Sequence, residues 1–168
     1  AASVMVAFNE VNGVPMHANR DLLTGVLRGD WHFDGLIVSD YTGVRELVAH
    51  GVAANDEAAG ILALEAGIDV DMVSGIYVNT LPGAARRGKV DVARIDAAVR
   101  RILSAKAVLG LFDDPYRNCN PARAKRQTLR PAHRAAARDL ARKSMVLLQN
   151  EGNILPLSKA LRSVAVIG

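Results

Sequence analysis

Three short apolar segments of this chain begin 32 residues apart, and helical spacing of apolar residues fills the intervals between them. The segments are residues 4–8 (VMVAF), 36–39 (LIVS) and 68–72 (IDVDM). Strand, helix and strand at such an interval are typical of βα units, whose right-handed crossovers place their strands in parallel. The unbroken apolar run 36–38 also fits a strand that is covered on both faces. The sequence therefore predicts an α/β fold built on a parallel sheet.

Capping residues and glycines mark where the helices begin and end. The predicted helices run from Asn19 to Gly29, from Tyr41 to His50, from Asn55 or Asp56 to Ala66, from Thr80 to Gly88, from Asp91 or Asp96 to Gly110, and from Pro131 to about Lys143. Residues 111–130 contain turn formers and no apolar period, which predicts a linker. After the last helix, residues 145–148 and 164–167 are predicted to be the first strands of a second domain.

Three βα units are too few for a closed barrel, which needs eight strands and about 250 residues. An open sheet of three strands would leave its edges exposed. We therefore expect residues 1–110 to be the C-terminal portion of a (β/α)8 TIM-type barrel, 111–130 a linker, and 131–168 the first elements of an αβα sandwich. Both ends of the chain are accordingly expected to be cut from a longer protein.

The alternative architecture is one small doubly wound domain. That fold predicts a Gly-rich phosphate-binding loop after the first strand, and residues 12–15 (NGVP) do not supply one. The same observation disfavours a barrel enzyme that acts on phosphate-bearing substrates.

Composition excludes several classes of protein. No uncharged apolar run reaches the roughly 20 residues of a membrane span, so we expect no membrane partner. Cys119 is the only cysteine, which excludes an internal disulfide. The histidines lack metal-ligand spacing, so neither a metal nor a cofactor is expected, and each is predicted to be a structural or surface group: His17, His32, His50 and His133.

A basic strip occupies residues 117–143, which carry nine Lys or Arg side chains and one acidic residue. Such a strip could bind nucleic acid. It contains no aromatic side chain on which a base could stack. We therefore interpret it as a solvated linker and helix face rather than a nucleic-acid site.

The stretch LIVSDY, residues 36–41, places a carboxylate and an aromatic ring directly after the second strand. Barrels and open α/β sheets carry their chemistry at the carboxyl ends of their strands. Asp40 is therefore a candidate catalytic residue. The alternative from these residues alone is that Asp40 caps the following turn or helix.

Five segments match a known family in order and spacing: VMVAFNEVNGVP (4–15), LLTGVLRGDWHFDGLIVSDY (22–41), LEAGIDVDM (64–72), GLFDDPY (110–116) and ARKSMVLLQNEGNILPL (141–157). The chain resembles glycoside hydrolase family 3, particularly the periplasmic-type bacterial β-glucosidases. The resemblance implies a retaining exo-glycosidase without a cofactor, with a barrel joined by a linker to an αβα sandwich. It also implies a periplasmic or secreted enzyme that acts on an oligosaccharide or glycoside.

By this resemblance, Asp40 takes the position of the catalytic nucleophile. A retaining glycosidase also needs a second carboxyl about 5 to 5.5 Å away to protonate the leaving oxygen. Glu46, six residues further on, is the candidate acid/base. The alternative is that Glu46 is an exposed helix residue beside Arg45, and that the acid comes from a part of the enzyme outside this chain.

Four further residues at the strand ends are candidates for contacts with a sugar. Tyr41 stands where many family members carry Trp and would stack on a sugar ring. Phe8 stands where many relatives carry Tyr, while Met72 and Ser74 end the third strand. For each of these residues, packing at the rim of the sheet is the alternative. Asp69 is expected to be a buried structural partner rather than a catalyst.

The leading hypothesis is hydrolysis of terminal β-linked glucosyl or similar residues through a covalent glycosyl-enzyme on Asp40. The alternative from another class is a non-catalytic carbohydrate-binding protein or an inactive remnant of such an enzyme. We expect the isolated 168-residue chain to be inactive, because the first five strands of the implied barrel lie outside it.

Overall fold

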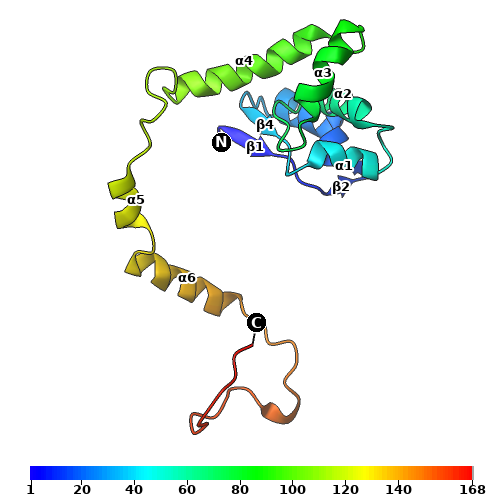
Figure 1. Ribbon diagram of the computed structural model, residues 1–168. Coiled ribbons are helices and arrows are strands. Elements are labelled where there is room, and N and C mark those ends of the chain that lie inside the picture. The colour runs from blue at the N-terminus through cyan, green and yellow to red at the C-terminus, as the bar shows by residue number, and fades with distance from the viewer. Residues whose placement is uncertain (168) are drawn as a thin grey trace. The chain divides into compact units, whose positions relative to one another are not determined.

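The computed structural model describes residues 1–167 and divides into two compact units, Ala1–Asn118 and Cys119–Gly168. Gly168, the last residue of the predicted second domain, lies outside the described residues. In Figure 1, strands β1 and β4 lie side by side in the first unit, and the second unit contains α5 and α6. None of the helices described within residues 1–167 has the length and apolar character that crossing a membrane requires.

The sheet that contains β1 and β4 is parallel, as the 32-residue interval predicts. Strand β1 (Ser3–Met5) pairs with β4 (Leu36–Val38) in parallel. The third predicted strand joins the other side of β4 through a single parallel bridge between Val38 and Val70. Strand β4 therefore lies between the two others. All three strands are shorter than the sequence predicts.

A β-hairpin that the sequence analysis did not predict follows β1. Strands β2 (Glu10–Val11) and β3 (Val14–Pro15) pair antiparallel. Asn12 and Gly13 connect them with φ angles of 54° and 77°. Two successive positive φ angles are what a two-residue hairpin turn with the twist of the strands requires, and Asn-Gly is the preferred pair. The local signal was present in the sequence.

Helices follow the strands at the predicted places. Those of the first unit are the 3-10 helix η1 (Met16–Ala18), the π-helix η2 (Asp21–Asp30), α1 (Gly43–Ala49), α2 (Asp56–Ala66), α3 (Ile76–Arg86) and α4 (Val92–Val108). The side chains of Asn19, Asn55 and Asp91 each accept a backbone N–H near the helix start, at 3.0, 3.0 and 2.9 Å. These three predicted caps are confirmed, since a capping oxygen satisfies an N–H that has no partner within the helix.

The start of α3 differs from the prediction. The helix begins at Ile76 rather than at Thr80, and Pro82 lies inside it. Asp71 and Ser74 supply the first turn with acceptors: Asp71 Oδ2 accepts the N–H of Tyr77 at 3.2 Å, and Ser74 Oγ accepts the N–H of Ile76 at 3.3 Å. Proline at the first turn of a helix is common, but here the caps lie further upstream and the chain tolerates proline in the helix interior.

The second unit contains two α-helices, α5 and α6, and the short 3-10 helix η3 (Glu151–Asn153) within its described residues. Helix α6 (Pro131–Ser144) confirms the predicted helix from Pro131 to about Lys143. Helix α5 (Pro121–Gln127) lies in the predicted linker, and Asn120 Oδ1 accepts the N–H of Arg123 at its start. All residues of α5 are exposed. The apolar period could not reveal this helix because none of its faces is buried.

Residues 145–148 and 164–167 are not strands in the structure. Both segments are irregular and exposed, with Leu148 at 92% and Val166 at 95% of full exposure. The prediction of strands is wrong for the described residues of this unit. A strand requires a neighbour for its backbone N–H and C=O groups, and no described segment pairs with either stretch.

The core of the first unit lies between β4 and helices α1–α3. Its fully buried members include Ile37, Val44, Leu47, Ile68 and Ile76. A second, smaller cluster joins α2, α3 and α4: Leu64, Leu81, Ala84, Val90 and Ala98. These contacts hold the helices that follow each strand against the sheet.

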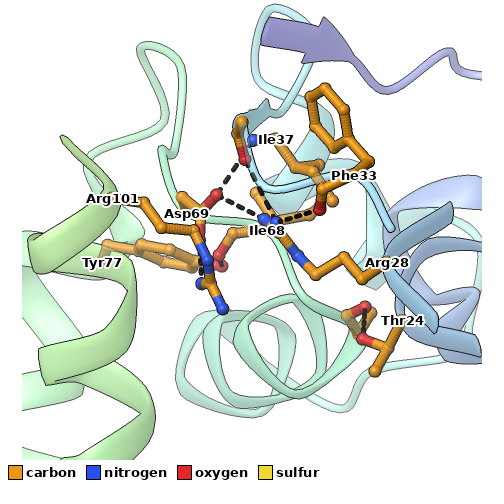
Figure 2. Close-up of polar contacts among 10 residues, drawn as sticks. Thr24, Arg28, Phe33, Ile37, Ile68, Asp69, Tyr77 and Arg101 are labelled. Carbon is orange, nitrogen blue, oxygen red and sulfur yellow. Dashed lines mark hydrogen bonds and ion pairs between the residues drawn. The ribbon is translucent and has the colours of Figure 1, made fainter. Parts of the chain in front are cut away.

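One charged group lies inside this core. Asp69 is 4% exposed and binds Arg28 of η2 and Arg101 of α4, each at 2.7 Å. Figure 2 shows the two guanidinium groups reaching Asp69 from different helices. The N–H of Ile37 also donates to Asp69 Oδ2, at 2.9 Å. The prediction that Asp69 is a buried structural partner is confirmed.

Candidate functional site

The predicted site residues gather at one edge of the sheet. Because the three strands are parallel, their carboxyl ends point the same way. Phe8 follows β1, Asp40 and Tyr41 follow β4, and Met72 and Ser74 follow Val70, the residue of the third segment that pairs with β4. The structure therefore brings the five residues to the edge at which α/β folds carry their chemistry.

The turn that leaves β4 is tied to the third segment by Ser39. This serine is fully buried. Its N–H donates to Val70 O at 2.9 Å, and its Oγ accepts the N–H of Met72 at 2.7 Å. The same hydroxyl donates to Asp40 O at 3.0 Å. Thr42, with a left-handed φ of 57°, donates its N–H to Met72 O at 3.0 Å. These bonds fix the backbone that carries Asp40.

The carboxylate of Asp40 is oriented by the next residue. Its Oδ1 accepts the N–H of Tyr41 at 2.7 Å. Helix α1 starts at Gly43, after Thr42, and has no side-chain cap. The side chain of Asp40 therefore does not cap this helix. Of the two structural roles considered for Asp40, capping of the turn and capping of the helix, the second is excluded. The side chain is partly exposed at the strand end, where a ligand could reach it.

A buried histidine lies beneath this turn. His17, from η1, is 2% exposed, and its Nε2 accepts the N–H of Asp40 at 3.0 Å. Its ring centre lies 5.9 Å from that of Phe8, with the planes tilted by 39°. A Cβ atom on Gly43 would lie 2.1 Å from His17 Nε2. The imidazole is thus held against the peptide units on both sides of the turn.

Burial lowers the pKa of His17 from its ordinary value of 6.5. The charges of Asp40 and Glu46 oppose this shift, and His50 adds to it, with a net lowering of the pKa. The neutral form is the one that can accept a hydrogen bond at Nε2, in agreement with the contact to Asp40. The sequence analysis assigned His17 to structural or surface groups and missed its contact with the candidate nucleophile.

Glu46 lies in the first turn of α1 and is partly buried. Its charge, like that of Asp40, raises the pKa of His17 and so opposes the effect of burial. Arg45 does not take Glu46 as its partner: it donates to a backbone oxygen at Ser74, at 2.8 Å. Glu46 is therefore available near the turn that carries Asp40.

The remaining candidates differ in exposure. Tyr41 is 60% exposed and Phe8 is 41% exposed, so each presents ring surface to solvent. Met72 is partly buried. Ser74 is 6% exposed, and its hydroxyl donates to Asp71 Oδ1 at 2.6 Å. The two rings can contact a ligand directly, whereas Ser74 shapes the end of the third segment.

The described residues 1–167 contain no group of three or more His, Cys, Asp and Glu side chains that could hold a metal ion. Cys119 is an exposed free thiol in the second unit.

Comparison with known proteins gives a consistent result. A family model described as the glycosyl hydrolase family 3 N-terminal domain matches residues 1–105. The chain is 42% identical to a periplasmic β-glucosidase of Salmonella typhimurium, covering 100% of this chain and 22% of that protein. It is 39% identical to a β-xylosidase of Formosa agariphila, covering 99% of this chain and 24% of that protein.

Among solved structures, a β-glucosidase from Listeria innocua superposes with a TM-score of 0.76 at 40% identity. The match covers 93% of this chain and 22% of the Listeria chain. The chain thus spans about a fifth of the length of the curated relatives it matches.

Proposed function

This chain belongs to glycosyl hydrolase family 3, and we propose that it supplies the catalytic nucleophile, Asp40, of a longer retaining β-glycosidase. The relatives are named β-glucosidases and β-xylosidases. The proposed substrate is therefore an oligosaccharide or glycoside with a terminal β-linked glucosyl or similar residue. The activity belongs to the longer enzyme, because this chain corresponds to about a fifth of its relatives.

One observation carries the proposal: Asp40 follows a buried parallel strand and is oriented by a backbone N–H within a turn that is itself bonded to the next strand. Retaining glycosidases need a carboxylate held in a fixed direction toward the anomeric carbon. The exposed rings of Tyr41 and Phe8 lie at the same edge and offer apolar faces on which a sugar can stack.

The proposed reaction has two steps. In the first, an Asp40 oxygen forms a bond to the anomeric carbon while the glycosidic C–O bond breaks, and a carboxylic acid gives its proton to the leaving oxygen. In the second, the same group, now a carboxylate, takes a proton from water, and the water oxygen displaces Asp40. No cofactor enters either step.

Glu46 is the proposed acid/base. Its place in the first turn of α1, the helix that follows the Asp40 turn, supports this role. The alternative is an acid from a part of the enzyme outside this chain, which leaves the role of Asp40 unchanged.

The parallel βα units also support the proposed architecture. Residues 1–110 would form the end of a (β/α)8 barrel, because a strand pair with one further bridge leaves sheet edges that a barrel closes. Residues 111–130 would be the linker and 131–168 the start of an αβα sandwich. A periplasmic or secreted location accompanies this proposal.

A fluoro-sugar that traps the glycosyl-enzyme tests the nucleophile. The intact enzyme is incubated with a 2-deoxy-2-fluoro β-glucoside and digested, and the labelled peptide is expected to contain Asp40. Asp40→Asn should abolish label and turnover, whereas Asp139→Asn, an exposed change in α6, should leave both unchanged. Label on a peptide without Asp40, or normal turnover in Asp40→Asn, would refute the proposal.

Azide separates the two assignments for the acid. With Glu46→Gln, a glycoside with a good leaving group should still be cleaved, and azide should accelerate turnover by replacing the water that Glu46 activates. If Glu46→Gln behaves like the parent enzyme, the acid lies elsewhere.

The isolated 168-residue chain is expected to be inactive, because it lacks most of the length of its relatives. A chromogenic β-glucoside, added to the purified chain and to the intact enzyme at equal concentration, measures this difference. Cleavage by the isolated chain would contradict the expectation.

A further inference from the structure

The mechanism above leaves one buried titratable side chain at the site without a role. His17 reaches the turn after β4 from a separate element, η1, and 23 residues separate it from Asp40. Its Nε2 lies 3.0 Å from the backbone nitrogen of the candidate nucleophile. A histidine whose only role was to pack in the core would not need to accept a hydrogen bond from that N–H.

We propose that neutral His17 is a positioning residue, which holds the peptide N–H of Asp40 and thereby sets the direction of the nucleophilic carboxylate. The proposal rests on the proposed function of Asp40. It assigns no contact between His17 and the substrate.

The packing around the imidazole restricts it to this one position. Phe8 lies against the ring on one side, with the planes tilted by 39°. Gly43 also lies close to the ring, since an added Cβ there would lie 2.1 Å from Nε2 and 2.4 Å from Cε1. The first residue of α1 therefore leaves room for His17, and movement of the ring would displace the start of the helix.

The bonds on either side of the His17 contact make the turn a continuous unit. The N–H of Asp40 donates to His17, its carbonyl accepts from Gly43 N at 3.0 Å and from Ser39 Oγ, and its Oδ1 accepts from Tyr41 N. Loss of the His17 acceptor leaves the Asp40 N–H without its partner in a buried place. The backbone would then turn toward another acceptor and carry the carboxylate with it.

The contact requires the neutral imidazole. Protonated histidine has two N–H donors and no acceptor. Protonation would therefore place an N–H of His17 against the N–H of Asp40, and the hydrogen bond would be lost. The charged and titratable groups whose charges act on His17 are Asp40 on the turn, Glu46 on α1 and His50 at the C-cap of α1. His50 in turn pairs with Glu10 of β2, at 3.0 Å. The effect of burial on the pKa of His17 outweighs that of the two carboxylates, so the imidazole is uncharged near pH 7.

Two substitutions of His17 in the intact enzyme separate the effect of its hydrogen-bond acceptor from the effect of its side-chain volume. His17→Gln keeps an acceptor oxygen at about the reach of Nε2 and cannot be protonated, whereas His17→Phe keeps a ring and removes the acceptor. His133→Gln, an exposed change in α6, is the matched control. Initial rates against pH and hydrogen exchange at the Asp40 amide are measured for each variant.

The expected result is a loss in kcat on the order of 10²-fold for His17→Phe, the size expected for a reacting group displaced by about 1 Å. KM should change by much less, because His17 does not touch the sugar. His17→Gln should retain most of the activity. The Asp40 amide should exchange faster in His17→Phe, and in the parent enzyme its protection should fall as the pH drops, with no such loss in His17→Gln.

Several results would overturn the inference. One is a His17→Phe enzyme with parental kcat and parental Asp40 exchange. If His17→Phe does not fold, His17→Gln decides: the same loss of Asp40 protection at low pH as in the parent contradicts a role for neutral His17. Full turnover in Asp40→Asn overturns the proposed function and this inference together. Inactive Asp40→Asn beside a fully active His17→Phe overturns the inference alone.

Discussion

Asp69 and Arg28 form a buried ion pair, with 2.7 Å between Oδ2 and Nη2, although 41 residues separate them in the sequence. Arg28 also donates to the carbonyls of Phe33 and Gly35, which precede β4. The pair therefore lies toward the amino end of β4, whereas Asp40 lies beyond its carboxyl end. In βα folds the amino ends of the strands contribute to stability and the carboxyl ends to function, and the buried pair and the proposed site of this unit would follow the same division.

Asp69→Asn is expected to destabilise the first unit by about 3 kcal/mol, because it leaves Arg28 without its buried counter-charge. The side chain of Arg101 is one-third exposed, so the loss of its pair with Asp69 contributes less to the destabilisation. The measurement is hydrogen exchange at the amides of Val6 and Ile68, which are both in backbone hydrogen bonds.

The control for this prediction is Asp139→Asn, which breaks the exposed pair with Lys143 in α6. Exposed pairs of this kind contribute about 0–1 kcal/mol. A loss at Asp69 no larger than at Asp139 would contradict a stabilising role for the buried pair.

Gly43→Ala is expected to lower kcat of the intact enzyme at least ~10-fold, because the added methyl would lie 2.1 Å from His17 Nε2 and displace the imidazole. Gly25→Ala, in η2, is the matched control, since nothing lies within 4 Å of its added Cβ. That change should leave kcat unaltered and stabilise by up to about 1 kcal/mol. Equal kinetics for the two variants would show that the space at Gly43 is not needed.

The stability of the first unit should fall in mild acid. The pKa of His17 is lowered in the folded state, so the unfolded chain binds a proton first as the pH drops below 6.5. The contribution of neutral His17 is fully present above 6.5 and is lost as the pH falls through its folded pKa. The measurement is the urea midpoint against pH, and His17→Gln should remove this part of the slope.

Tyr77→Phe should destabilise the first unit by about 1 kcal/mol, because the phenol donates to Ile68 O at 3.0 Å. Burial raises the pKa of Tyr77 well above 10.0, with Asp71 and Asp69 adding to the shift. Its contribution is therefore present below pH 10.0 and is lost as the pH rises through the folded pKa. Tyr116→Phe, at an exposed position, is the control and should leave alkaline stability unchanged.

Local chemistry accounts for the elements that were predicted correctly. Each strand is marked by its own short apolar run, and the caps Asn19, Asn55 and Asp91 each bond a residue two or three positions further on. Such local signals can be read directly from the sequence. The hairpin at Asn12 had an equally local signal that was overlooked. Helix α5 had no apolar period because it has no buried face.

The candidate site likewise has one part that the sequence predicts and one part that it does not. Asp40 is placed by its position after an apolar strand and by the family resemblance, both of which are properties of the sequence. The contact of His17 with the Asp40 N–H and the role of Gly43 could not be predicted, because the residues come from different elements and meet only when α1 packs against η1.

The sequence by itself determined the βα order, most helix limits and the family of this protein, since these depend on neighbouring residues and on motifs. Only the tertiary structure decided which cations pair with the buried Asp69 and which side chain supports the Asp40 turn. The physical reason is that burial and hydrogen bonding act through space: Arg28 and Asp69, or His17 and Asp40, become neighbours only once the sheet and its helices have packed.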